Sequence, residues 1–508
     1  MKGLNKIIRN NNSYRNCFKN FMIGIKKNLT FVLLIIFLLS ISIRVFFANG
    51  LSQPDSFAYA KIANDIAQGL DFKPDWFYNF RFLFTYPLSL FFKIFGVSTH
   101  SVLIWPLLCF TIEFFVLIKI LDLLQIKINK IIPALLIAFY PIDIKASVAL
   151  LPDITLSVIF AISFCLVLIG LKNKKIMYLI ASGLIVASGQ FVKEYALIFN
   201  LILILVLILH IGVKDAKKYI FWLLIGNLII IITVLLISYF KEKDFLYLYH
   251  NYISFRNIQI SLIINQSIKN PISNFWLYSK TIFYSPNSPY FYLLFIGLAI
   301  AYKKRAKPIL IYGIWIGVLF LFLQFGFLKF RPLIMIFKSE RFLTILTIPV
   351  IITSAYSIQM FLSLKKIKPY LKRISKHILT NMLLTVTIVL IIIFFSFSHR
   401  HYQKSLLPDY YAANFLKTQK ELPIVLLHEK MVSEYEFYFK YKKSFYVYGE
   451  DTINKPYYLV IDTLFFKGLY DEKLWIIENP DDQLITPPKS WEKIQEYDNH
   501  LFIYEVQT

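Results

Sequence analysis

Charged side chains interrupt or border the long apolar runs of this sequence. Their types indicate which reactions or ligands they could serve. Arginine is scarce, with 10 residues against 45 lysines, yet five arginines lie within or close to apolar or aromatic segments: Arg44, Arg81, Arg256, Arg331 and Arg341. A guanidinium group binds phosphate through two parallel hydrogen bonds, which an ammonium group cannot do. The arginines therefore fit a phosphate site at a membrane surface, although chance placement explains so small a number equally well.

Carboxylates accompany these cations at the edges of apolar runs. An ionisable group at or inside a membrane span is costly, so each one is a candidate functional residue. Asp153, in Leu-Leu-Pro-Asp, begins an apolar run, where a carboxylate is also a good helix cap. Asp55 has the same two interpretations, and Glu113, in mid-run, can equally bond to a neighbouring helix. Other candidates are Asp143, Lys145, Lys193, Glu194, Arg331, Lys338 and Glu340.

The composition indicates that membrane-spanning helices position these charged groups. The 508 residues are 57% hydrophobic and only 17% charged, whereas soluble domains carry about 25% charged residues. A soluble globular enzyme is therefore excluded, and the apolar runs predict a polytopic α-helical membrane protein. We expect about eleven spans, at 29–48, 100–124, 131–144, 150–171, 176–192, 195–211, 219–240, 286–302, 308–328, 342–362 and 377–398.

The lysines predict the orientation of these spans. Alternate connections are basic, and six such segments hold 25 Lys and Arg residues but only two acidic ones. Positively charged short loops stay in the cytoplasm, so we expect a multi-pass plasma membrane (inner membrane) protein with a cytoplasmic N-terminus and an exterior C-terminus. Most of the net charge of +25 then reports orientation, and no nucleic-acid partner is implied. The run at 29–48 is too long for a signal peptide, so we expect it to be retained.

Three parts are expected in the chain. They are a basic cytoplasmic tail (1–28), a multi-span domain (29–398) with exterior loops at 49–99 and 241–285, and a small exterior soluble α/β domain (399–508). In the first loop, Pro54, Asp55 and Gly69 fit the start and end of a helix. The tail should contain helices at 408–420 and 431–440, and strands at 423–427, 444–448, 457–461 and 501–506.

Cofactor motifs are absent from the sequence. There is no Gly-rich phosphate loop, no CxxC pair and no His/Cys cluster at zinc spacing. The three cysteines, Cys17, Cys109 and Cys165, lie in the cytoplasmic tail and in spans. The sequence therefore does not signal a nucleotide-sugar or ATP site, and no cofactor is certain from it.

The order of these features resembles a known family. After the first span comes an exterior Pro-Asp-x-x-x-Tyr-Ala-x-Ile-Ala helix, followed by Arg81 and Thr-Tyr-Pro-Leu-Ser-Leu-Phe-Phe-Lys-Ile-Phe-Gly. Leu-Pro-Asp153 then opens a span, Lys193 follows a span, Arg256 lies in an aromatic loop and Ser-Glu-Arg341 opens a late span. This order is similar to that of GT-C glycosyltransferases related to protein O-mannosyltransferases and aminoarabinose transferases. The resemblance covers most of 29–362.

The resemblance implies a function and roles for five residues. Such enzymes transfer a sugar from a polyprenyl-phosphate-linked donor to a hydroxyl of a lipid, glycan or protein acceptor, with inversion at the sugar carbon. Asp55 would be the general base and Asp153 a second carboxylate at the site. Lys193 and Arg256 would neutralise the donor phosphate as it leaves, assisted by Arg341.

Two departures from the family pattern bear on metal binding. Ser56 follows Asp55, where many members have an acidic residue, and Phe84-Thr85-Tyr86 precede Pro87, where the aminoarabinose-type enzymes have an acidic one. The pattern therefore gives no support for a divalent metal. The Trp-Trp-Asp motif of oligosaccharyltransferases is also absent.

Two other classes of function remain open from the sequence. A transporter or flippase for a lipid-linked or anionic substrate would also have many spans and charged groups. It would need ionisable groups near the membrane midplane, where only Glu113 and His210 qualify. A non-catalytic membrane protein whose tail binds a partner is the third possibility.

Overall fold

The computed structural model of the protein describes most of the chain up to residue 363 and short segments beyond it. The described ranges are 29–48, 51, 54–70, 81–124, 128–247, 250, 277–329, 334–335, 339–363, 415–418, 424–426, 446–447, 457–462, 491–497 and 501–506. The predicted span 377–398 and the residue Arg256 lie outside these ranges.

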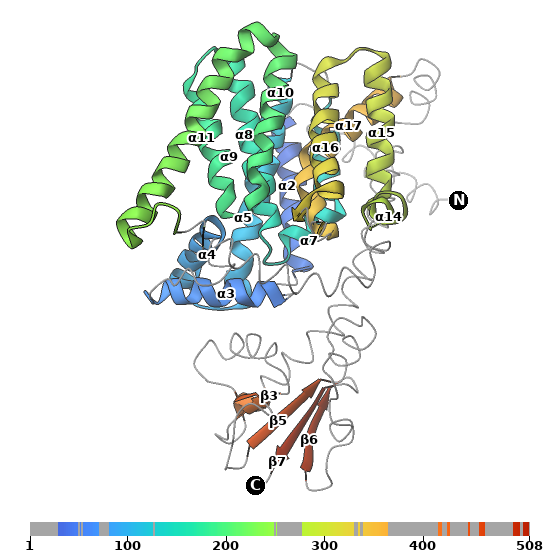
Figure 1. The fold of residues 1–508 in the computed structure, drawn as a ribbon. Helices are drawn as coiled ribbons and strands as arrows, with labels where there is room; N and C mark the ends of the chain where they lie inside the picture. The colour runs from blue at the N-terminus through green and yellow to red at the C-terminus, as the bar shows by residue number, and fades with distance from the viewer. Residues whose placement is uncertain are drawn as a thin grey trace, which may run out of the picture.

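A bundle of apolar helices makes up the larger part of the fold (Figure 1). α8, the helix that opens at Asp153, is largely buried in the bundle, whereas α2 and α11 expose most of their side chains. The long helices of the bundle are α2 (Leu29–Phe46), α5 (Thr99–Leu123), α8 (Asp153–Asn173), α9 (Met177–Ser188), α10 (Phe199–Ile211), α11 (Val213–Glu242), α15 (Ser288–Lys303), α16 (Lys307–Phe325) and α17 (Thr347–Leu362).

Seven segments of the described chain are long and apolar enough to cross a membrane. They begin at Leu29, Thr99, Asp153, Glu194, Val213, Lys307 and Glu340. Because about 20 apolar residues span the hydrocarbon layer, these helices confirm a polytopic helical membrane protein. The expected total of eleven spans stays a prediction, since α9 and α15 are shorter and 377–398 is not described.

The predicted span 131–144 is divided in two. α6 (Ile131–Ala138) ends before Tyr140, whose backbone is extended, and α7 (Pro141–Ser147) begins with Pro141 at its first position. Proline cannot donate the hydrogen bond that would continue α6, but it suits a helix start. The interruption turns the chain at one end of the bundle.

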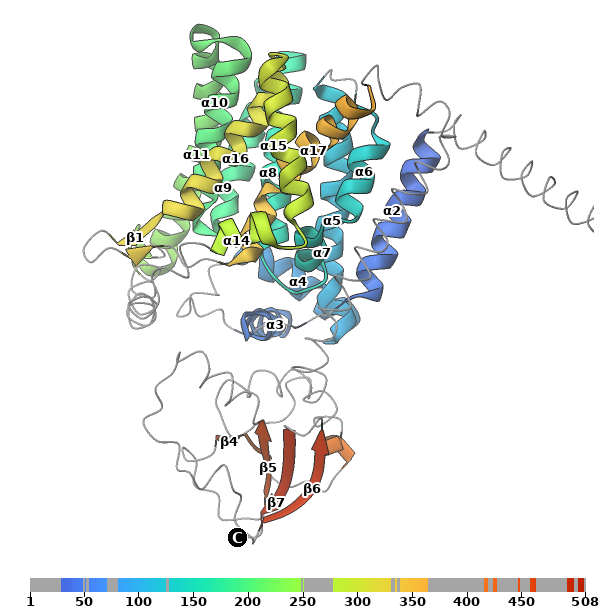
Figure 2. The same ribbon diagram turned by 90° about the vertical axis from the view of Figure 1, so that its right-hand side faces the viewer.

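The helix predicted in the first loop is present as α3 (Pro54–Ala67). It lies crosswise over one end of the bundle, beside α4 (Phe82–Phe95), as both views show (Figures 1 and 2). Its buried face includes Tyr59, Ala60 and Ala63, which pack with Phe84 of α4 in a small apolar core. Gly69 follows the helix at a φ of +73°, a conformation that glycine adopts without strain.

α11 is attached closely to the two helices that precede it. A Cβ atom added to Gly183 of α9 would lie 2.0 Å from the Leu223 carbonyl oxygen of α11, and one added to Gly226 would lie 2.2 Å from the Ile180 oxygen. Glycine at both positions lets the backbones touch, as is common between membrane helices. Asn200 of α10 and Asn227 of α11 exchange two side-chain hydrogen bonds, of 2.8 and 3.0 Å.

Charged groups inside the bundle are paired. Arg44 of α2 donates to Asp143 of α7 at 2.5 Å and to Ser147 at 2.8 Å, and all three are buried. Its guanidinium also lies over the Phe110 ring, 3.4 Å from the centroid. Nearby, Glu113 of α5 accepts a hydrogen bond from Ser157 of α8. A buried charge is tolerated only with such partners.

The last described strands form a mixed five-stranded sheet. β3 (Ile424–Leu426) is parallel to β4 (Tyr446–Val447) and β5 (Tyr457–Asp462), and β7 (Leu501–Val506) is antiparallel to β5 and β6 (Trp491–Tyr497). The sequence predicted four of these strands but not β6. The predicted helices lie mainly outside the described residues, so the α/β domain stays a prediction. A separate short pair joins β1 (Phe327–Lys329) to β2 (Ile334–Met335).

We expect Arg44→Met to destabilise the protein strongly. The substitution leaves the buried Asp143 carboxylate without its guanidinium partner, which costs about 3–5 kcal/mol of unfolding free energy. The fall in Tm in detergent micelles measures this. Lys130→Met is the matched control, because it removes one member of the exposed pair with Asp122, which is worth about 0–1 kcal/mol. Equal effects of the two variants would contradict the assignment.

Candidate active site

Asp55 and Arg341 meet at the end of the bundle covered by α3. Asp55 lies in the first turn of α3, and Arg341 lies in the 3-10 helix η4 (Glu340–Leu346), which leads into α17. Arg341 Nη2 donates to Asp55 Oδ2 at 2.8 Å. The Asp55 side chain is 28% exposed, so the carboxylate is held by the guanidinium and remains accessible from outside the bundle.

Asp153 lies on the other side of Arg341. It occupies the first turn of α8, is fully buried, and has its Oδ2 atom 3.8 Å from Arg341 Nε. The positive end of the helix dipole stabilises a carboxylate at this position. Arg341 therefore lies between two carboxylates whose positions in the sequence are almost 100 residues apart.

Lys193 reaches Asp153 from an interruption between two helices. The chain leaves α9 through η2 (Gly189–Phe191), is extended at Lys193, and resumes as η3 (Glu194–Ile198) and α10. Lys193 Nζ donates to Asp153 Oδ1 at 2.5 Å and lies 4.0 Å from the Phe342 ring centroid. Burial lowers the pKa of Lys193 to about 8, and the negative charge of Asp153 opposes this effect.

Arg81, which precedes α4, is a further cation at this site. It is buried, hydrogen bonds to the Tyr59 hydroxyl, and lies over the Tyr59 ring with 5.3 Å to the centroid. Burial lowers the pKa of Arg81, and the charges of Glu194, Asp55 and Asp153 raise it. Sequence analysis placed Arg81 among the arginines that fit a phosphate site but did not include it among the five residues given a role in the reaction.

These residues form one charge cluster, which we define as Asp55, Arg81, Asp153, Lys193 and Arg341. The structure thus brings together four of the five residues selected from the sequence. Their roles are untested, and Arg256 falls outside the described residues. Three cations face two carboxylates, so the cluster carries an excess of positive charge that an anion can neutralise.

Metal ligands do not gather in the part of the chain that the structure describes. No group of three or more His, Cys, Asp and Glu side chains is placed to hold an ion there. The carboxylates of Asp55 and Asp153 instead contact guanidinium and ammonium groups.

A family comparison agrees with this arrangement. Residues 81–238 match the model of the dolichyl-phosphate-mannose-protein mannosyltransferase family, a range that contains Asp153 and Lys193. The match covers less than a third of the chain and supports the predicted resemblance to glycosyltransferases of this kind. A sequence comparison with curated proteins finds no match.

Two solved structures show the same fold at low sequence identity. The archaeal oligosaccharyltransferase AglB from Archaeoglobus fulgidus, in complex with an inhibitory peptide and a dolichol-phosphate, matches 82% of this chain with a TM-score of 0.52 and 14% identity. The chain covers 64% of the length of AglB. ArnT from Cupriavidus metallidurans in the apo state matches 95% of this chain and 98% of its own, with a TM-score of 0.50 and 12% identity.

The ionisation of Lys193 can be followed by NMR of isotopically labelled lysines in micelles, with Lys193→Arg assigning the signal. We expect a midpoint near pH 8. Asp153→Asn should lower the midpoint further, because it removes the negative charge that stabilises the ammonium form. A midpoint near 10.5, the ordinary value, would show that Lys193 is not buried as described.

Proposed function

We propose that the protein transfers a sugar from a polyprenyl-phosphate-linked donor to a hydroxyl acceptor at the exterior face of the plasma membrane, with inversion. The observation that carries this proposal is the position of Arg341 between Asp55 and Asp153. Lys193 also pairs with Asp153. Further support comes from the family whose name contains dolichyl-phosphate-mannose, and from AglB, whose structure contains a dolichol-phosphate.

Asp55 is the general base of this reaction. It is the more exposed of the two carboxylates, so an acceptor hydroxyl can approach it from outside the bundle. The acceptor oxygen forms a bond to the anomeric carbon of the sugar while the bond from that carbon to the phosphate oxygen breaks. The hydroxyl proton passes to Asp55, a step that general bases accelerate by about 10²–10⁴-fold.

The cations act on the leaving phosphate. A sugar phosphodiester carries one negative charge and gains a second as the bond to the sugar breaks. Lys193 and Arg341, with Arg256 as predicted from the sequence, neutralise that developing charge. Their stabilisation is therefore greater in the transition state than in the bound substrate, which is the condition for catalysis.

Asp153 positions these cations. Its two oxygens face Lys193 Nζ and Arg341 Nε, so a single buried carboxylate sets the spacing between ammonium and guanidinium. Burial excludes it from direct contact with a large acceptor. We assign Asp153 to positioning and Asp55 to proton transfer.

The C-terminal sheet belongs to the same side of the protein in this proposal. Both views place β5, β6 and β7 beyond α3, on the side of the bundle where the charge cluster lies (Figures 1 and 2). This side is the exterior one if the basic connections are cytoplasmic. The 399–508 segment can then contribute to the choice of acceptor.

Asp55→Asn tests the base. Purified protein is incubated with a panel of polyprenyl-phosphate hexoses and pentoses and an envelope extract, and release of polyprenyl phosphate is measured. We expect a loss of about 10²–10⁴-fold in rate, because the amide cannot accept the proton. Polyprenyl phosphate binding should change by less than about tenfold, the effect of one hydrogen bond.

Asp122→Asn is the matched control for this experiment. Asp122 pairs with Lys130 at the surface of the bundle, away from the charge cluster, so its loss should leave transfer unchanged. Equal transfer by wild type and Asp55→Asn would rule out the assigned base. If wild type releases no polyprenyl phosphate from any donor in the panel, a transporter becomes the better hypothesis.

Lys193 gives the reaction a defined pH dependence. In the protein without substrate it is charged below about pH 8 and neutral above it, so kcat/KM for the donor should fall as the pH rises through that value. Lys193→Arg should move the fall to higher pH, because a guanidinium stays charged. Lys193→Met should lower kcat/KM below about pH 8 and abolish the fall, because wild-type Lys193 has already lost its charge at higher pH. Persistence of the fall in Lys193→Met would assign it to another group.

A further inference from the structure

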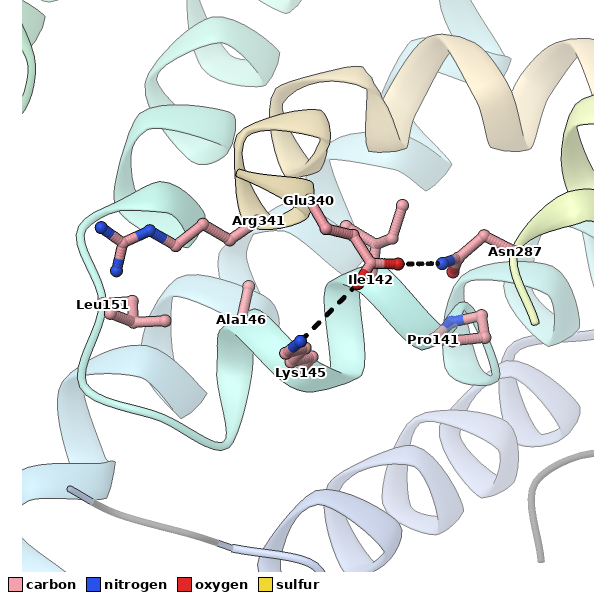
Figure 3. Close-up of a pocket in the computed structure, with 8 residues that line it drawn as sticks. All are labelled: Pro141, Ile142, Lys145, Ala146, Leu151, Asn287, Glu340 and Arg341. Atoms are coloured by element: carbon pink, nitrogen blue, oxygen red, sulfur yellow. Dashed lines mark hydrogen bonds and ion pairs between the residues drawn. The ribbon is translucent and has the colours of Figure 1, made fainter. Parts of the chain in front are cut away.

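A small notch, with a mainly apolar surface and a few polar side chains, lies beside the charge cluster (Figure 3). We call it the Glu340 notch and define its polar residues as Lys145, Asn287, Glu340 and Arg341, with an apolar wall from α7 and Leu151. Its volume of about 10 Å³ is enough for one water-sized group. Arg341 belongs to both places, because the residue that lines the notch also binds Asp55.

The notch contains an unsatisfied hydrogen-bond acceptor. Asn287, which precedes α15, is 1% exposed, and its Nδ2 donates to Glu340 Oε1 at 2.9 Å. Its Oδ1 atom is buried and has no hydrogen-bond partner among the described residues. An acceptor left in this state is costly, so the position favours a ligand that donates a hydrogen bond.

Charged groups at the notch contribute both kinds of hydrogen-bonding partner. Glu340 Oε2 lies 3.7 Å from Lys145 Nζ, which is within ion-pair range but too long for a hydrogen bond. The side chains of Lys145 and Glu340 are 45% and 33% exposed, so each can also bind a ligand. Figure 3 shows Glu340 between Lys145 and Asn287, while Arg341 extends the other way.

This combination selects among ligand classes. A phosphate would face the Glu340 carboxylate and the Asn287 oxygen, and a cation would face Lys145. An apolar group would leave Asn287 Oδ1 without a partner. A hydroxyl donates one hydrogen bond and can also accept hydrogen bonds, so it satisfies Asn287 or Glu340 as a donor and Lys145 as an acceptor.

We propose that the Glu340 notch binds one hydroxyl group of a sugar ring held at the charge cluster, and thereby selects the sugar. This inference rests on the proposed function. The sugar is joined directly to the phosphate that Arg341 helps to bind, and the acceptor hydroxyl lies at Asp55, which Arg341 also contacts. A sugar at either position is adjacent to the notch, so the ring belongs to the donor or to a glycan acceptor.

Glu340→Gln and Asn287→Ala test the notch, with Asp122→Asn as the control. The probes are polyprenyl phosphate, the polyprenyl-phosphate sugar that wild type consumes from the hexose and pentose panel, and the acceptor fraction of the envelope extract. If the donor sugar occupies the notch, both variants should raise the Kd of the sugar lipid about tenfold and leave that of polyprenyl phosphate within about twofold. If an acceptor sugar does, only the KM for the acceptor should rise.

Deoxy analogues of the same donor, each lacking one hydroxyl, identify the group that is bound. For one analogue, the binding constant of wild type should weaken to the value that Glu340→Gln shows with the complete sugar. Glu340→Gln should bind that analogue no more weakly than it binds the complete sugar, as coupling between the two partners requires. The same Tm for all variants excludes misfolding.

Two results would overturn the inference, and a third would overturn the proposed function on which it rests. If wild type transfers sugar and neither variant changes any constant more than about twofold, the notch has no part in binding. Equal weakening of sugar lipid and polyprenyl phosphate would show that Glu340 only supports Arg341. No transfer and no polyprenyl phosphate binding by wild type would instead refute the proposed function itself.

Discussion

The arrangement of the end of the bundle that α3 covers depends on a single guanidinium group shared by two carboxylates. Arg341 contacts Asp55 on α3 and Asp153 on α8, and Lys193 completes the pairing of the buried Asp153. A buried carboxylate without partners would cost several kcal/mol, so each of these elements needs the others in place. The same pairing that makes the burial tolerable also brings together the proposed general base and the proposed phosphate-binding cations. Stability and the proposed chemistry therefore require the same geometry.

Local features of this geometry could be predicted from the sequence. The helix of Asp55 and the position of Asp153 at a helix start follow from proline, glycine and the onset of apolar runs, which are local signals. Lys193 was recognisable as a charge between two apolar runs. The contact of Arg341 with Asp55 was not, because 286 residues separate them and only the packing of α3 over the bundle joins them. The contact of Arg81 with Tyr59 could not be predicted for the same reason, since it depends on how α3 lies against α4.

The contacts between helices inside the bundle could not be predicted from the sequence either. Hydropathy gives the length of an apolar run but not which face of the helix meets which neighbour. The pairing of Arg44 with Asp143 therefore could not be foreseen, although both charges were visible. The break at Tyr140 and Pro141 places Asp143 opposite Arg44, so an apparent defect in a predicted span is the feature that allows the ion pair.

α11 contributes no residue to the charge cluster, yet it holds the two helices that flank one member, Lys193. Lys193 lies in the turn between α9 and α10, and α11 holds the first through the Gly183 and Gly226 backbones and the second through the Asn200–Asn227 amide pair. Any shift of α11 is therefore transmitted to both ends of that turn. Because α11 faces lipid along most of its length, the thickness and lateral pressure of the surrounding bilayer become physical inputs to the position of a buried ammonium group.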